Sequence, residues 1–179
     1  MARAAVIFLT LLLLWLLLAE ANHYLTPVHI YLFAGGLFVT FAALRLPFRP
    51  GLATVLLGGL LCDANMPIAS GLRPFAFSLA HVHVLLFVVA FVAIYRLRDR
   101  MARDETLIRV LVAVVANLGL FLGLSFARMA AAPLSGAAWL RLLFDLACSQ
   151  AVVALIAPWF FALQGRALAL ARAEPVALN

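Results

Sequence analysis

Six separate runs of the chain are too apolar to be stable in water, and short polar connections divide them. Because about 20 apolar residues cross a bilayer as a helix, the pattern predicts an all-α, polytopic membrane protein with a six-helix transmembrane bundle. The third run is shorter than the others and rich in glycine. The predicted spans are Ala4–Ala21, Val28–Leu46, Gly51–Cys62, Phe75–Tyr95, Leu107–Phe126 and Trp139–Leu163.

The composition leaves little of the chain outside the membrane. Hydrophobic residues make up 68% of the sequence and charged residues 11%, whereas about 25% of a soluble domain is charged. The 179 residues therefore predict a single transmembrane domain, 1–179, with no folded extramembrane domain. The net charge of +6 fits loops that face an anionic lipid bilayer, and we expect no nucleic-acid partner.

The first apolar run has a second interpretation. Arg3, the run that follows it and the sequence Ala19-Glu20-Ala21 resemble a secretory signal peptide with a small-x-small cleavage site. We favour a retained first helix and keep cleavage as the alternative.

The arginines predict an orientation. With the N-terminus inside, cytoplasmic segments hold ten of the thirteen and outer segments hold three. This positive-inside bias predicts that both termini are cytoplasmic. The ten are Arg3, Arg45, Arg49, Arg96, Arg98, Arg100, Arg103, Arg109, Arg166 and Arg172, and the three are Arg73, Arg128 and Arg141.

Residues 96–105 are the most charged part of the chain. We interpret them first as a solvated loop that anchors the topology. The functional alternative is a docking site for a cytoplasmic partner, formed by Arg96, Arg98, Arg100 and Arg103.

Polar residues at bilayer depth are functional candidates, because an ionisable group there costs about 2.5–3.5 kcal/mol. At 1.5 Å per residue, His81 lies about 9 Å below the outer end of its span, Asp145 lies at a similar depth, and Asn117 lies about 13 Å deep. Asp63 ends the third span on the same side. These positions predict a polar pocket or seam in the outer half of the bundle.

Each candidate also has a structural interpretation. Asp145 is four residues from Arg141 and can pair with it on one helix face. Asn117 can form an interhelical hydrogen bond, and Gly119 with Gly123 can form a small-residue face for close packing. His81 and His83 point to nearly opposite sides of a regular helix, so we expect no metal site.

The sequence contains no nucleophile motif, phosphate-binding glycine loop or zinc-protease motif. We therefore predict a protein that is not an enzyme and has no cofactor.

Residues 58–72, Gly-Gly-Leu-Leu-Cys-Asp-Ala-Asn-Met-Pro-Ile-Ala-Ser-Gly-Leu, resemble the signature of the rod shape-determining protein MreD family. In that signature a short glycine-containing helix ends in aspartate, and a proline-bearing turn leads to Gly-Leu and the next span. The length, the six runs, the basic loop after the fourth run and Pro158 in the last run agree with it, whereas Arg73-Pro74 departs from it. The candidates for binding a partner's transmembrane helix or a ligand are therefore Asp63, Asn65, Gly71 and Arg73 of this turn, together with His81, Asn117 and Asp145.

The resemblance implies a non-catalytic inner-membrane scaffold of the bacterial cell-elongation machinery, which builds peptidoglycan in rod-shaped cells. Its expected partner is an MreC-like bitopic protein, and through it MreB-like filaments, a SEDS glycosyltransferase and a class B penicillin-binding protein. The MreD family is also similar in fold to the substrate-binding subunits of energy-coupling-factor vitamin transporters, and this is the rival function.

Overall fold

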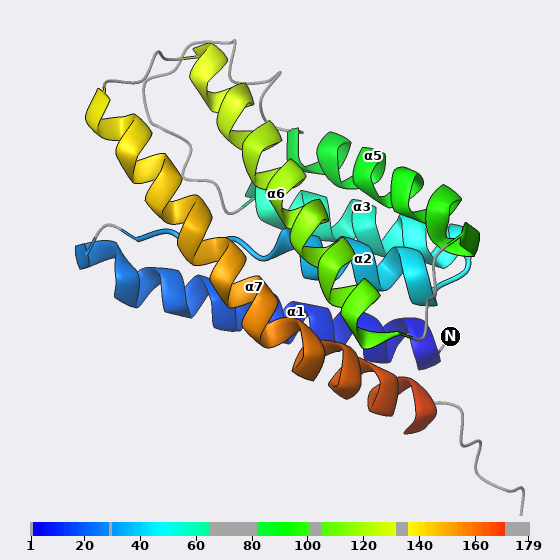
Figure 1. Ribbon diagram of the computed structural model, residues 1–179. Coiled ribbons are helices and arrows are strands. Elements are labelled where there is room, and N and C mark those ends of the chain that lie inside the picture. Colours follow the sequence, from blue (N-terminus) through cyan, green and yellow to red (C-terminus); the bar gives the residue numbers. More distant parts are fainter. Residues whose placement is uncertain (1, 29, 65–81, 101–104, 132–135, 171–179) are drawn as a thin grey trace, which may run out of the picture.

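The computed structural model describes residues 2–28, 30–64, 82–100, 105–131 and 136–170. These residues form helices and no strand, as the all-α prediction requires. Two short 3-10 turns, η1 (Thr26–Val28) and η2 (Arg98–Arg100), follow α1 and α5. The helices are α1 (Ala2–Leu25), α2 (Gly35–Arg45), α3 (Phe48–Ala64), α5 (Val82–Leu97), α6 (Thr106–Ala131) and α7 (Gly136–Leu170), arranged as in Figure 1.

Two of the described helices are long and apolar enough to cross a membrane, at Thr106–Ala127 in α6 and Trp139–Ala167 in α7. Only 28% of each segment is buried inside the bundle, which is unlike the core helix of a soluble protein. Leu12–Leu25 and Gly35–Arg45 form shorter apolar helices. Length and composition therefore support a membrane location, and they do so through the predicted fifth and sixth spans.

The second predicted span differs in its bounds from the helix that forms. A single helix was expected over Val28–Leu46, but η1 ends at Val28, residues 30–34 form no regular secondary structure, and α2 begins only at Gly35. The prediction of a continuous helix is wrong because polar side chains from neighbouring helices satisfy the backbone of this segment, as described below. Hydropathy does not distinguish an apolar helix from an apolar extended segment.

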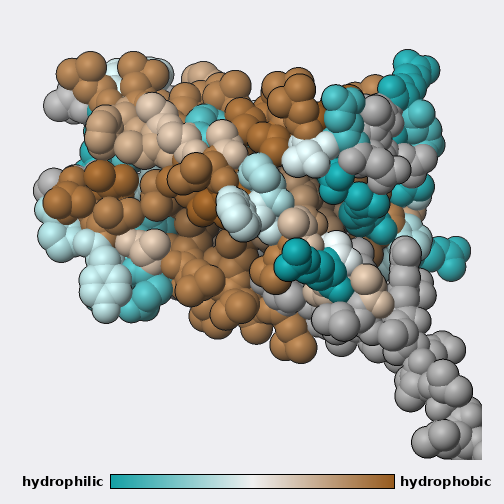
Figure 2. Space-filling model, turned by 60° about the horizontal axis from the view of Figure 1, so that its bottom comes forward, coloured by the Kyte–Doolittle hydropathy of each residue, from teal (hydrophilic) through white to brown (hydrophobic). Residues whose placement is uncertain are grey.

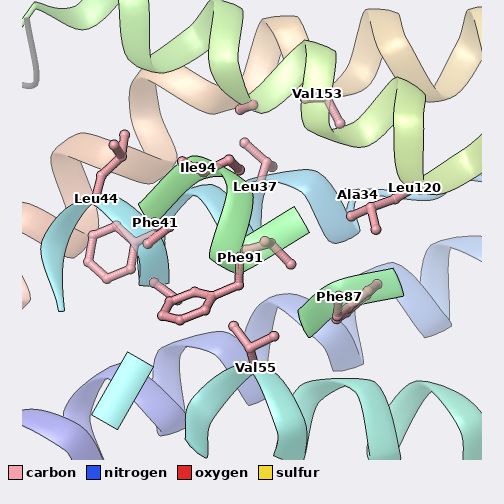
Figure 3. Close-up of a cluster of buried hydrophobic side chains, with 14 of the residues drawn as sticks. Ala34, Leu37, Phe41, Leu44, Val55, Phe87, Phe91, Ile94, Leu120 and Val153 are labelled. Carbon is pink, nitrogen blue, oxygen red and sulfur yellow. The ribbon is translucent and has the colours of Figure 1, made fainter. Parts of the chain in front are cut away.

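Helix α2 is the centre of the bundle. It contacts α3, α5, α6 and α7, and eight of its eleven residues are buried. A helix that is apolar on all sides is stable only when other helices surround it. Side chains such as Leu37 and Phe41 of α2 meet Val55 of α3, Phe91 of α5 and Val153 of α7 in the core shown in Figure 3.

Glycines allow close approach at two helix contacts. A Cβ atom on Gly36 would lie 2.4 Å from the backbone nitrogen of Asn117 on α6, and one on Gly59 would lie 2.7 Å from Cα of Val84 on α5. By contrast, nothing lies within 4 Å of a Cβ on Gly119, and one on Gly123 meets only the Leu86 side chain. Within the described residues, therefore, Gly119 does not contact another helix and Gly123 contacts a side chain of α5, so the close-packing face formed by these two glycines stays a prediction.

The helix ends that carry most of the described arginines lie together. The start of α1, the end of α2, the start of α3, the end of α5, the start of α6 and the end of α7 are all at one end of the bundle (Figure 1). The space-filling view shows a broad hydrophobic surface, with hydrophilic residues gathered toward its ends (Figure 2). Arg141, near the start of α7, lies at the opposite end.

Candidate functional site

A non-helical stretch of backbone, residues 30–34, passes between helices of the bundle (Figure 1), and we call it the extended segment. Extended backbone cannot satisfy its own N–H and C=O groups, and each buried group without a partner costs about 1–3 kcal/mol. At membrane depth such a segment is tolerated only inside protein or beside water. Four side chains from three helices supply the missing hydrogen bonds: Asn22, Asn117, Asp145 and Ser149.

Asn22, near the end of α1, pairs with Leu32 through both atoms of its amide. The side-chain nitrogen donates to the Leu32 carbonyl at 2.8 Å, and the side-chain oxygen accepts from the Leu32 N–H at 2.7 Å. This arrangement reproduces the paired hydrogen bonds of a neighbouring strand. It therefore ties α1 to the extended segment.

Helix α7 supports the same segment from another side. The N–H of Tyr31 donates to Oδ1 of Asp145 at 3.0 Å, and the N–H of Phe33 donates to Oγ of Ser149 at 3.0 Å. The Ser149 hydroxyl donates in turn to the Tyr31 carbonyl at 3.4 Å. Arg141 lies 4.0 Å from the other Asp145 oxygen, so the expected Arg141–Asp145 pair is present but longer than these bonds.

Asn117 of α6 joins the end of the segment to the start of α2. Its side-chain nitrogen donates to the Phe33 carbonyl at 3.0 Å, and its oxygen accepts from the Gly36 N–H at 3.0 Å. The residue is fully buried. Gly36 is needed here because only a residue without a side chain lets the α2 backbone approach α6 this closely.

A second polar contact joins α3 to α5. Asp63, in the last turn of α3, accepts from Nδ1 of His83 at 2.6 Å and from the His83 backbone N–H at 3.3 Å, and its other oxygen lies 3.5 Å from the Val84 N–H. Both side chains are buried. A carboxylate at this position satisfies free N–H groups of the first turn of α5 and interacts favourably with the helix dipole.

Aromatic rings connect the two polar contacts. The His83 ring lies 6.2 Å from the Phe87 ring, and Phe87 lies 6.4 Å from Phe33 of the extended segment. Phe33 also packs edge-on against Phe121 of α6 at 6.2 Å. The space between the Asp63–His83 pair and the extended segment is therefore filled at least in part by side chains of the chain itself.

The structure brings some of the predicted site residues together and separates others. Asn117 and Asp145 act on one segment, whereas Asp63 binds the start of α5. His83, rather than the nominated His81, is the histidine of this site that the structure describes, and it faces the interior. The predicted residues Asn65, Gly71, Arg73, His81 and Arg103 lie outside the described residues.

The predicted cytoplasmic docking residues that the structure describes differ in their exposure. Arg98 is partly buried: its guanidinium stacks 3.7 Å from the centre of the Tyr95 ring, and Nη1 donates to the Leu46 carbonyl at 3.1 Å. It therefore holds the end of α5 against the end of α2. Arg96 and Arg100 are exposed.

Sequence analysis did not select Asn22 or Ser149. Ser149 stands four residues after Asp145, on the same helix face. This spacing could have indicated that the two side chains bind the same partner. Asn22 follows the first apolar run directly, and nothing in its neighbourhood indicates a partner ten residues later.

No protein-family model, curated protein or solved structure matches the chain. Its site is therefore interpreted from geometry. Within the part of the chain that the structure describes, no three histidine, cysteine or carboxylate side chains converge as metal ligands would. The polar side chains described above bind the chain's own backbone, and this arrangement stabilises a broken helix inside the bundle.

Replacing Asp63 with alanine is expected to lower the free energy of unfolding by about 1–3 kcal/mol, because it removes the acceptor for two N–H groups and for the buried His83 ring. Thermal unfolding in detergent measures the change. Asp99→Ala is the matched control for loss of a carboxylate. The Asp99 side chain is 71% exposed, and an exposed ion pair such as its 3.7 Å contact with Arg98 contributes little to stability. Equal midpoints for the two variants would contradict the capping role.

Proposed function

We propose that the chain is a six-span inner-membrane protein, with both termini in the cytoplasm, that acts as a non-catalytic scaffold of the cell-elongation machinery. The apolar exteriors of α6 and α7 and the gathering of arginine-bearing helix ends support the membrane topology. A reporter fused after Asn179 is expected to read as cytoplasmic. A periplasmic signal would contradict the orientation.

The observation that carries the scaffold proposal is the contrast between interior and exterior. The interior polar groups bind the chain's own backbone, whereas the outward faces of the long helices are apolar and exposed. On α7, Leu155 is 74% exposed and Trp159 is 78% exposed. Such faces contact lipid tails or another transmembrane helix, and neither contact requires chemistry.

The residues that resemble the MreD signature have structural roles compatible with a scaffold. Gly59 lets α3 approach the backbone of α5, and Asp63 caps α5. Both residues therefore serve the junction of two helices. We propose, from the resemblance to the MreD family, that the partner is an MreC-like bitopic protein, which would connect the bundle to MreB-like filaments, a SEDS glycosyltransferase and a class B penicillin-binding protein.

The rival function is the substrate-binding subunit of an energy-coupling-factor vitamin transporter. A vitamin site needs convergent polar groups that face the ligand. Asn117 and Asp145 were the best candidates for such groups, but they bind the backbone of Tyr31, Phe33 and Gly36. Because these side chains already bind backbone groups, they do not supply the polar contacts that a vitamin would need, and this favours the scaffold.

The test is purification of the tagged protein from its native membrane in mild detergent, followed by mass spectrometry. We expect recovery of a bitopic protein together with cell-wall synthases. Recovery of paired ATPases with a coupling membrane subunit would instead support the transporter.

An exposed-face variant tests where the partner helix packs. Ala147 and Ala151 are exposed and four residues apart on α7, a spacing that lets a second helix approach closely. Ala151→Trp is expected to reduce recovery of the bitopic partner. Val115→Trp, at a 59% exposed position on α6, is the control for added bulk. Equal recovery with both variants and the unmodified protein would exclude this face of α7.

A further inference from the structure

Two exposed apolar stripes on neighbouring helices each end in an arginine at the same end of the bundle. On α3, exposed apolar residues follow Arg49 in the chain at intervals of three or four residues. On α5, exposed apolar residues precede Arg96 at intervals of four residues. The stripe on α3 is Ala53, Leu56, Leu57 and Leu60, and the stripe on α5 is Leu85, Val89 and Ala93.

The contacts between α3 and α5 place the two helices that carry the stripes side by side. Gly51 packs on the Phe91 ring, while Gly59 packs on Val84, so the helices are antiparallel neighbours. At the arginine end, the Phe48 ring lies 5.2 Å from the Tyr95 ring. Arg49 follows Phe48 in the chain and Arg96 follows Tyr95, so the backbones of the two arginines are held at the same level by this ring contact.

The length of the stripes fits one leaflet of a bilayer. Arg49 and Leu60 are eleven residues apart, as are Leu85 and Arg96, which corresponds to about 16 Å along each helix. The hydrocarbon core of a bilayer is about 30 Å thick. Each stripe therefore covers about the depth of one acyl chain, with the arginine at the level of the headgroups.

The charge at this end is complementary to an anion. The ends of α2, α3 and α5 carry Arg45, Arg49, Arg96, Arg98, Arg100 and Asp99, so five positive charges less one negative charge leave +4. At the neighbouring start of α6, the charges of Glu105 and Arg109 cancel. Basic residues at the cytoplasmic surface attract anionic lipid headgroups, each contributing about 1 kcal/mol. Exposed Phe48 and Leu97 provide apolar contacts beside the charges.

We propose that the α3–α5 face binds an anionic diacyl phospholipid of the cytoplasmic leaflet, with its phosphate between Arg49 and Arg96 and its acyl chains along the two stripes. This inference rests on the membrane topology of the proposed function but not on the identity of the protein partner. A bound lipid would cover the α3–α5 junction and stabilise it.

Native mass spectrometry of the purified protein tests the proposal, with dioleoyl phosphatidylglycerol as the probe and dioleoyl phosphatidylcholine as the uncharged comparison. We expect retention of phosphatidylglycerol in preference to phosphatidylcholine. The Arg49→Gln/Arg96→Gln double variant should weaken phosphatidylglycerol binding about thirtyfold. Arg166→Gln, at an exposed position in α7 at the same end, should leave binding unchanged.

Three results would overturn the proposal. Equal retention of the two lipids would remove the role of charge, and equal loss in the double variant and in Arg166→Gln would remove the role of this site. Displacement of the lipid by glycerol phosphate at equal concentration would show a site for a soluble phosphate. Both substituted arginines are exposed, so unchanged thermal unfolding in phosphatidylcholine confirms that the variants fold. Because lipid retention uses the purified protein alone, it is independent of partner recovery.

Discussion

Replacing Gly36 with alanine is expected to lower the free energy of unfolding by about 3 kcal/mol, at the upper end of the cost of overpacking. The added Cβ would lie 2.4 Å from the backbone nitrogen of Asn117 and 2.6 Å from the carbonyl oxygen of Ala113. Both atoms belong to the backbone of α6, so no side-chain rotation relieves the contact. Helices α2 and α6 must separate, which also lengthens the hydrogen bond from the Gly36 N–H to Asn117.

Gly119→Ala is the matched control, because this glycine lies on α6 itself and nothing is within 4 Å of the added Cβ. Alanine favours a helix over glycine by about 0.8–1 kcal/mol, so we expect Gly119→Ala to be neutral or slightly stabilising. Unfolding by denaturant in detergent measures both variants. If the two substitutions shift the midpoint in the same direction by similar amounts, the α2–α6 contact is not as close as described.

Replacing Asn117 with alanine is expected to lower the free energy of unfolding by about 2–6 kcal/mol. The change leaves the Phe33 carbonyl and the Gly36 N–H without their partner in the interior, and each such group costs about 1–3 kcal/mol. The end of the extended segment should loosen first, because Asn117 holds both sides of its junction with α2. Hydrogen exchange of the Gly36 amide, measured by mass spectrometry of the peptide that contains it, should accelerate.

Ser125→Ala is the control for loss of a buried polar group on the same helix. Ser125 is buried, but its hydroxyl donates only to the Phe121 carbonyl one turn earlier in α6. Its removal leaves the extended segment untouched, so we expect a small change and normal exchange at Gly36. A loss of stability as large as that of Asn117→Ala would mean that the effect comes from burial of polar groups in general. Gly36 and Asn117 are in contact, so the effects of their substitutions should not be additive.

Most of the helices could be predicted from the sequence, because the hydrophobic effect acts on composition over a window of residues. The described helices overlap all six apolar runs. The bounds of α2 could not be predicted. The segment before α2 is held by Asn22, Asn117 and Ser149, which lie on three other helices, and a hydropathy pattern does not record which faces of those helices meet.

The candidate site was predicted in part. Asn117 and Asp145 were selected because polar groups are costly at bilayer depth, and both belong to the network around the extended segment. Their role differs from the expected lining of a pocket or seam, since they bind backbone. The contact role of the glycines could not be predicted either. Gly36 and Gly119 each stand inside an apolar run, but Gly36 lies against another helix and Gly119 does not.

The helical class, the apolar exterior and the distribution of arginine along the chain follow from residue type and local order. Water or lipid acts on these properties one segment at a time. The break in the second apolar run, the glycine that is a contact point, and the pairing of the polar groups depend on the folded arrangement of the helices. Hydrogen bonds and close packing depend on atoms that are brought within a few ångströms by folding, and residues as far apart as Phe33 and Ser149 meet only then.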